Sequence, residues 1–195
     1  DPAKLLLAAL HDSGDAEAAA VMAEIEVFLQ ILPDGKVVAP WRAINLMKQV
    51  CSSLAEAHGQ GLIHRDLKPS NIILTEHADG TEFVNVVDFG LVKDLGGPEG
   101  DQTQVGMIVG SPMYMSPEQI RAKPLTSRSD LWSLGVVLYE LILGERPFHG
   151  DTPVAILASL LSDTVPEISV EQRRKMPDEL MAVILRCLNR DPERR

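Results

Sequence analysis

The sequence predicts an α+β fold that is mainly α-helical and contains one small β-hairpin. Two observations lead to this class. Apolar residues recur at helical spacing before residue 60 and again after residue 129, and two short β-branched runs lie between these regions. With 195 residues, of which 45% are apolar and 24% charged, the chain is long enough to bury a core.

The first forty residues are predicted to be mostly helical. Residues 16–32 place their apolar side chains on one helical face, Asp15 is a suitable N-cap, and the sequence PDG at 33–35 indicates a turn. A second amphipathic helix is expected at about 41–58. Its apolar face comprises Ile44, Met47, Val50, Cys51 and Leu54.

The middle of the chain predicts the hairpin and then a long loop. The runs IIL (72–74) and FVNVV (83–87) bracket HADG, whose Asp-Gly pair favours a tight hairpin turn. Residues 94–112 are rich in Gly, Pro and polar side chains. Their apolar residues follow neither the helical nor the strand spacing. A loop of this length is either functional or disordered.

Helical patterns return after this loop. The sequence DLWSLGVVLYELILG (130–144) is apolar almost all round, which predicts a buried central helix. The sequences TPVAILASLLSD and DELMAVILRCLNR follow as amphipathic helices.

Composition excludes several classes of protein. The net charge of -10 argues against nucleic acid as the main partner, and no apolar run is long enough for a membrane span. Cys51 and Cys187 are far apart and are expected to be core thiols in a reducing compartment. The chain begins with Asp1 rather than methionine, so we expect a fragment or a processed product.

The chemistry-bearing residues cluster in HRDLKPSN (64–71) and DFG (88–90). These motifs place Asp66, Asn71 and Asp88 on either side of the hairpin, so all three side chains could face one cleft. Asn71 and Asp88 offer hard oxygen ligands suited to Mg²⁺. Asp66 is then available as a base for a hydroxyl nucleophile, and Lys68 supplies positive charge where phosphoryl transfer develops negative charge.

These motifs, together with SPE (116–118), DLWSLG (130–135) and DPERR (191–195), resemble the protein kinase family in order and spacing. The stretches GSPMYMSPEQI and SDLWSLGVVLYELILGERPF are similar to the eukaryotic-like (Hanks-type) serine/threonine kinases of bacteria. The resemblance covers about residues 41–195, which correspond to the large C-terminal lobe without its last helix. Residues 1–40 form an atypical N-terminal segment.

The resemblance implies ATP and Mg²⁺ as cofactors and a role for each matching residue. Asp66 would orient the substrate hydroxyl and accept its proton, and Lys68 would contact the γ-phosphate. Asn71 and Asp88 would bind Mg²⁺. Ser111, which stands where the family usually has threonine, would bridge Asp66 and Lys68 through its hydroxyl group.

Other matching residues would support the site. The resemblance implies that His64 and Phe89 pack in an internal hydrophobic column and that Gly90 gives the DFG loop its flexibility. It also implies that Asp130 on the central helix holds the main chain of the catalytic loop.

Two further matches concern the segment after the hairpin. The resemblance implies an ion pair between Glu118 and Arg195. Arg65, directly before the catalytic aspartate, suggests regulation by phosphorylation of the 94–112 loop, since a phosphate would give Arg65 a charge-assisted partner. Thr103 is the expected acceptor. Ser70 stands where an acid would favour basic substrates, so we expect no strong preference for them.

The small β-rich lobe of the family is missing. Its G-x-G-x-x-G loop, strand lysine and helix glutamate have no match, and Lys4 with Glu24 or Glu26 is a poor substitute because the intervening chain is too short. Positioning supplies most of the catalysis in phosphoryl transfer, so we expect this chain alone to be inactive or nearly so.

Three functions remain open. The first is a serine/threonine protein kinase, with a protein substrate and room for a homodimer that phosphorylates in trans. The second is a pseudokinase-like scaffold that has lost the nucleotide-binding lobe. The third, a metabolite or antibiotic phosphotransferase, would not need the SPE segment. The expected location is cytoplasmic, with any membrane tether outside this region.

Overall fold

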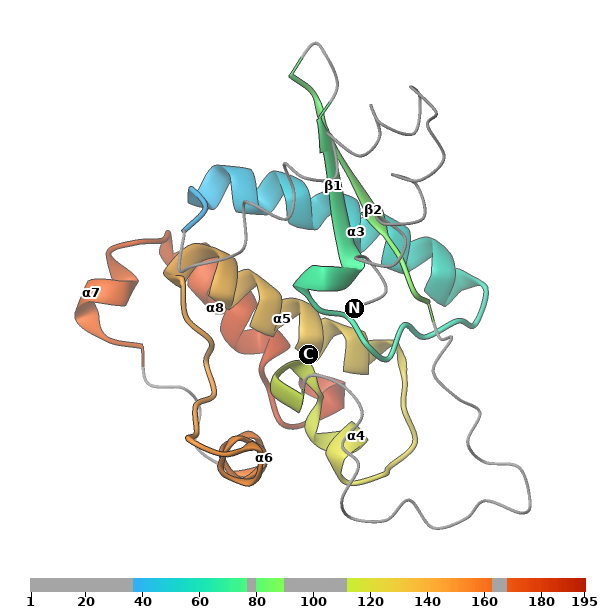
Figure 1. Cartoon of the computed structure of the whole chain (residues 1–195), viewed down its shortest axis with the longest axis vertical. Coiled ribbons are helices and arrows are strands. Elements are labelled where there is room, and N and C mark those ends of the chain that lie inside the picture. Colours follow the sequence, from blue (N-terminus) through green and yellow to red (C-terminus); the bar gives the residue numbers. More distant parts are fainter. Residues whose placement is uncertain (1–36, 77–79, 90–111, 163–167) are drawn as a thin grey trace, which may run out of the picture.

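The computed structural model describes residues 37–76, 80–89, 112–162 and 168–195 (Figure 1). The described part is mostly helical with a two-stranded sheet, which confirms the predicted fold class. The expected helix at 16–32 lies outside the described residues, as do Gly90, Thr103 and Ser111. The elements are α3 (Pro40–Gly59), β1 (Ile72–Glu76), β2 (Glu82–Val86), α4 (Pro117–Ile120), α5 (Ser127–Leu143), α6 (Pro153–Leu161), α7 (Val170–Arg173) and α8 (Asp178–Cys187), with short 3-10 turns η1 (Pro69–Asn71), η2 (Pro112–Tyr114) and η3 (Pro192–Arg194).

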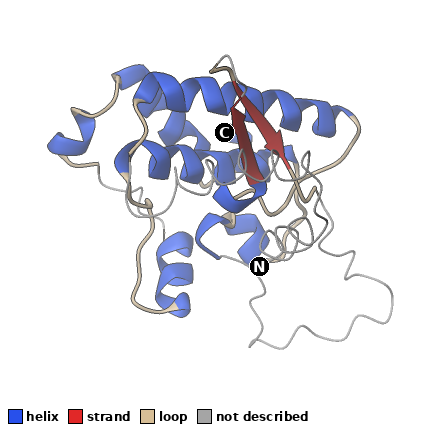
Figure 2. Ribbon diagram, turned by 45° about the horizontal axis from the view of Figure 1, so that its top comes forward, coloured by secondary structure: helices blue, strands red, loops and turns tan. Residues whose placement is uncertain are grey.

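The hairpin is anchored on α3. Strands β1 and β2 pair antiparallel, with Ile72 opposite Val86. Gln49 of α3 bonds the outer edge of β2: its Nε2 donates to the Glu82 carbonyl at 3.0 Å, and its Oε1 accepts from the Val84 N–H at 2.9 Å. One helix side chain thereby satisfies two main-chain groups that an edge strand would otherwise leave to solvent. Both views place the hairpin against α3 (Figure 1, Figure 2).

Helix α5 is the centre of the core, as its apolar sequence predicts. It begins at a capping box between Thr126 and Ser129 and ends at Gly144, whose φ of 77° suits a glycine C-cap. It packs against α3 and α8. At Gly135 the approach to α8 is so close that an added Cβ would lie 2.6 Å from the Cys187 Cβ. The fully buried side chains of the core include Val50, Leu67, Trp132, Val136, Leu160 and Ile184.

One expectation about an individual side chain is wrong, because Cys51 is exposed rather than a core thiol. The buried stripe of α3 runs through Ala43, Met47 and Val50, and Cys51 lies one residue beyond it. In the described part of the chain, no helix combines the length and apolar character needed to cross a membrane.

Candidate active site

The loop between α3 and η1 is held by a buried carboxylate from α5. Asp130, 1% exposed, accepts the His64 N–H at its Oδ2 and the Arg65 N–H at its Oδ1, both at 2.9 Å. His58 at the end of α3 lies 2.7 Å from the same Oδ2 through its Nε2. Because α5 is the most buried helix, these bonds fix the loop relative to the core.

His64 links this loop to the end of β2. Its Nε2 lies 3.0 Å from the Val87 carbonyl oxygen, and its Nδ1 accepts the Asp66 N–H at 3.3 Å. Both contacts are satisfied at once by a neutral imidazole with the proton on Nε2. The His64 ring also packs on Phe89, with the ring centroids 4.7 Å apart. The loop and the DFG segment are therefore held together by one side chain.

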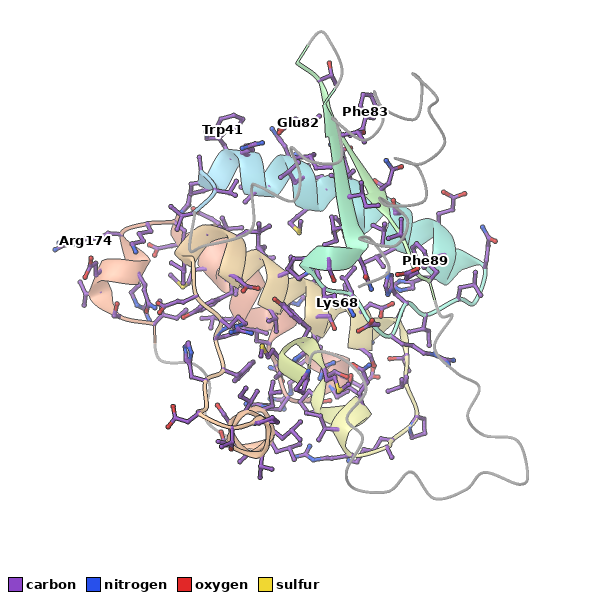
Figure 3. All side chains as sticks on the ribbon, in the orientation of Figure 1. Trp41, Lys68, Glu82, Phe83, Phe89 and Arg174 are labelled. Carbon is purple, nitrogen blue, oxygen red and sulfur yellow. The ribbon has the colours of Figure 1, made fainter. Side chains whose placement is uncertain are left out.

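Asp66, Lys68 and Asn71 converge beside this histidine. Lys68 Nζ donates to Asp66 Oδ2 at 2.7 Å, and Asn71 Nδ2 donates to the Asp66 main-chain carbonyl at 2.8 Å. The Asp66 and Lys68 side chains remain 32% and 20% exposed, so both contact solvent. Figure 3 labels Lys68 and Phe89 near the base of the hairpin, where the loop and the end of β2 meet.

Asp88 lies next to Asn71 through the main chain. The Val87 N–H donates to the Asn71 carbonyl at 2.9 Å, which places the following residue beside the loop. Asp88 is exposed and has a φ of 63°, and Arg65 has a φ of 67°. Non-glycine residues at positive φ are uncommon and cluster at functional sites, because the surrounding structure must hold them there.

Asn71 and Asp88 carry the type of oxygen donor that suits Mg²⁺. The Asn71 Nδ2 is used by the Asp66 carbonyl, so its Oδ1 is the side-chain atom left for a cation. The Asp88 carboxylate supplies the second hard oxygen. Mg²⁺ takes few protein ligands and completes its octahedral shell with water and phosphate oxygens, so two such ligands suffice.

The segment after the 90–111 stretch is anchored by a buried ion pair. Arg195 donates from Nη1 and Nη2 to the two carboxylate oxygens of Glu118, at 2.5 Å and 2.8 Å, and Ser129 donates to Glu118 Oε1 at 2.8 Å. Burial by itself raises the pKa of the Glu118 carboxyl. The bonds from Arg195, from its own main chain and from Ser129 outweigh burial, so the net pKa is lowered.

A second bond to α5 fixes the same segment. The Tyr114 hydroxyl donates to Glu140 Oε2 at 2.6 Å, and Ser133 donates to the Tyr114 carbonyl at 2.8 Å. Burial, followed by the bond to Glu140 and its negative charge, raises the pKa of Tyr114 well above the ordinary value. Tyr114 is therefore a neutral hydroxyl at any physiological pH, and it donates to the carboxylate.

Two residues that contact the loop were not predicted from the sequence. One is His58, which shares Asp130 with the loop main chain. The other is Gln119, whose Nε2 donates to the Arg65 carbonyl at 2.5 Å. The pattern S-x-x-Q at 116–119 is a capping-box signal, but that signal does not indicate the second bond that the glutamine makes.

Comparison with known proteins shows the family of the chain. The family model of the protein kinase domain matches residues 16–195. Over 159 aligned residues the chain is 39% identical to the serine/threonine-protein kinase PknB of Mycolicibacterium smegmatis, which covers 81% of the chain and 24% of that protein. It is 34% identical to PknB of Mycobacterium tuberculosis over 198 residues, with 97% and 31% covered, and 40% identical to Pkn1 of Myxococcus xanthus over 162 residues, with 83% and 23% covered.

The chain thus spans roughly a quarter to a third of the length of these curated relatives. The family model covers more than half of the chain and includes every motif on which the resemblance was based. The chain therefore belongs to the protein kinase family and is related to the bacterial, Hanks-type kinases.

Proposed function

We propose that this chain supplies the large lobe of a serine/threonine protein kinase that transfers the γ-phosphate of ATP to hydroxyl groups of proteins. The observation that carries the proposal is the arrangement around Asp66. Its carboxylate is bonded by Lys68, its carbonyl is bonded by Asn71, and Asp88 follows a residue bonded to Asn71. A scaffold would have no chemical need for all four polar groups in this arrangement.

Each residue has a chemical task in the proposed reaction. Asp66 orients the substrate hydroxyl and takes its proton as the oxygen bonds to the γ-phosphorus and the bond to the β-γ bridging oxygen breaks, which releases ADP. Lys68, 2.7 Å from Asp66, stabilises the charge that develops on the transferred phosphoryl group. Asn71 and Asp88 would hold Mg²⁺, which would neutralise the phosphate charge when bound.

Two residues outside the described ranges complete the proposal. The proposed role of Ser111 is that its hydroxyl would bridge Asp66 and Lys68. Phosphorylation of Thr103 would supply a dianion as a partner for Arg65, which is exposed. In this proposal the Arg65 guanidinium then orders the 94–112 loop.

The partners follow from the reaction. The substrate is a protein, and autophosphorylation at Thr103 would proceed in trans within a homodimer. The two free cysteines and the need for ATP favour the cytoplasm. Any membrane tether would lie outside this region.

The alternative is a pseudokinase-like scaffold. We expect the isolated 195-residue chain to be inactive or nearly so, because half of the nucleotide-binding surface of the family is not recognisable in it. Detectable transfer of phosphate by the purified chain would contradict that expectation.

The test is transfer of the labelled γ-phosphate from ATP to a library of Ser- and Thr-containing peptides by the natural full-length protein. Transfer that Asp66→Asn and Asp88→Asn each abolish supports the kinase. The two variants also separate the steps, because Asp88→Asn should weaken Mg²⁺-ATP binding in calorimetry whereas Asp66→Asn should not. A folded full-length protein that neither binds Mg²⁺-ATP nor transfers phosphate would favour the scaffold.

A further inference from the structure

Both main-chain polar groups of Arg65 are bonded by side chains from two different helices. Asp130 of α5 accepts the Arg65 N–H at 2.9 Å, and Gln119 of α4 donates to the Arg65 carbonyl at 2.5 Å. Arg65 has a φ of 67°, a conformation that costs free energy for a non-glycine residue. The two helices thus hold the residue directly before Asp66 in a strained conformation.

The orientation of the Gln119 amide is determined by its own helix. Its Oε1 accepts the Ser116 N–H at 2.8 Å and the Ser116 hydroxyl at 3.0 Å, which is the reciprocal half of a capping box. Turning the amide over would place its oxygen against the Arg65 carbonyl and its nitrogen against the Ser116 N–H. Only one orientation satisfies both ends, so Nε2 must face the catalytic loop.

The peptide plane between Arg65 and Asp66 is consequently held at both ends. Its oxygen is bonded by Gln119, and its N–H, which belongs to Asp66, is bonded by Nδ1 of His64 at 3.3 Å. Rotation of this plane changes ψ of Arg65 and φ of Asp66 together. Such a rotation moves the Asp66 carboxylate away from Lys68, which bonds it at 2.7 Å.

Helix α4 provides a rigid base for this contact. Glu118, the neighbour of Gln119, is buried and bonded by Arg195 and Ser129. Without this anchor, a helix of four residues would not hold the Gln119 side chain in one position. With Glu118 fixed in the core, the position of Gln119 is set by the same buried ion pair that fixes the segment after residue 111.

We propose that Gln119 is a positioning residue for Asp66: its amide bonds the Arg65 carbonyl and thereby sets the peptide plane that orients the catalytic carboxylate. The inference rests on the proposed kinase function. Gln119 touches neither substrate nor nucleotide in this scheme and acts only through the main chain of the loop.

Gln119→Glu in the natural full-length protein is the decisive variant. Glutamate retains the acceptor for Ser116 and is itself a good capping-box residue, but it cannot donate to the Arg65 carbonyl. Ser116→Ala is the matched control, because it removes the hydroxyl half of the cap and leaves the bond to Arg65. Gln119→Ala removes both the acceptor for Ser116 and the donor to the Arg65 carbonyl.

The expected result is a split between catalysis and stability. Gln119→Glu lowers kcat about tenfold, the effect of one net hydrogen bond, with the KM values for ATP and peptide changed less than about twofold and an unchanged melting temperature. Ser116→Ala lowers the melting temperature and retains kcat. The inference would be overturned if Gln119→Glu retained the wild-type kcat. It would also be overturned if Gln119→Glu and Ser116→Ala both lost kcat in proportion to their loss of stability.

Hydrogen exchange of the Asp66 amide gives a readout that does not depend on activity. Gln119→Glu should speed this exchange about tenfold relative to wild type, while Ser116→Ala leaves it unchanged. If the wild-type protein transfers no phosphate, the proposed function fails, and the exchange rates still decide whether Gln119 holds the peptide plane. Equal exchange rates in all three proteins would refute the contact itself.

Discussion

The ion pair between Glu118 and Arg195 should contribute strongly to the stability of this domain. The Arg195 side chain is 0% exposed and Glu118 is 6% exposed, and the guanidinium also donates to the carbonyls of Asn189 and Arg128. Arg195→Met removes the cation and leaves a buried carboxylate with only Ser129 as a side-chain donor. Removal of one partner from a buried ion pair costs about 3–5 kcal/mol.

This loss is large compared with the whole stability of a domain, which is about 5–15 kcal/mol. For a chain of this length it corresponds to a fall in melting temperature of about 6–20 °C. The measurement is thermal and urea unfolding of Arg195→Met followed by circular dichroism. The control is the double variant Glu118→Gln with Arg195→Met, which removes the unpaired charge and should recover part of the loss.

The same pair predicts how stability depends on pH. The pKa of Glu118 is lowered from the ordinary value of 4.5, so the unfolded chain binds the proton more tightly than the folded one. The contribution of the pair is therefore present above the unfolded-state pKa and is lost as the pH falls through the lower, folded-state pKa. Glu118→Gln should reduce the loss of stability below pH 4.5. A destabilisation of Arg195→Met under about 1 kcal/mol, or a double variant no more stable than the single one, would refute this reasoning.

Three further predictions concern the core and the loop. Gly135→Ala should cost about 1–3 kcal/mol in urea unfolding, because its Cβ would lie 2.6 Å from the Cys187 Cβ, whereas Gly59→Ala, with nothing within 4 Å, should be neutral or stabilising. Asp130→Asn should cost about 1–3 kcal/mol, because the two loop N–H groups bond different carboxylate oxygens and the amide replaces one of these oxygens with an NH2 donor; unchanged unfolding would contradict the bonding. Burial raises the pKa of Cys187 to about 11, so a thiol reagent at pH 8 should label exposed Cys51 first and Cys187 mainly on unfolding, as mass spectrometry would show.

The sequence by itself determined the fold class, because its signals are local. Helical periodicity identified α3 to within a residue or two at each end, and the two β-branched runs identified the strands of the hairpin. The apolar sequence of α5 indicated a central helix, and that helix is buried on nearly all sides. The motifs around Asp66 and Asp88 identified the family, which the family model then confirmed.

Side-chain exposure on α3 could not be predicted from the same pattern. A stripe of apolar residues shows which side of a helix faces the core, but it does not show how wide the buried face is. That width depends on the shape of α5 and the hairpin, against which α3 packs. Val50 lies within the covered width and is fully buried, and Cys51, about 100° further round, lies outside it.

Only the tertiary structure decided how the catalytic loop is held. The strained φ values of Arg65 and Asp88 are properties of loops whose conformation is imposed by distant residues. Gln119 contacts Arg65 across 54 positions of sequence, and Asp130 contacts it across 65. Local sequence encodes helices, turns and caps because these depend on neighbours in the chain, whereas contacts of this kind exist only after α4 and α5 have packed.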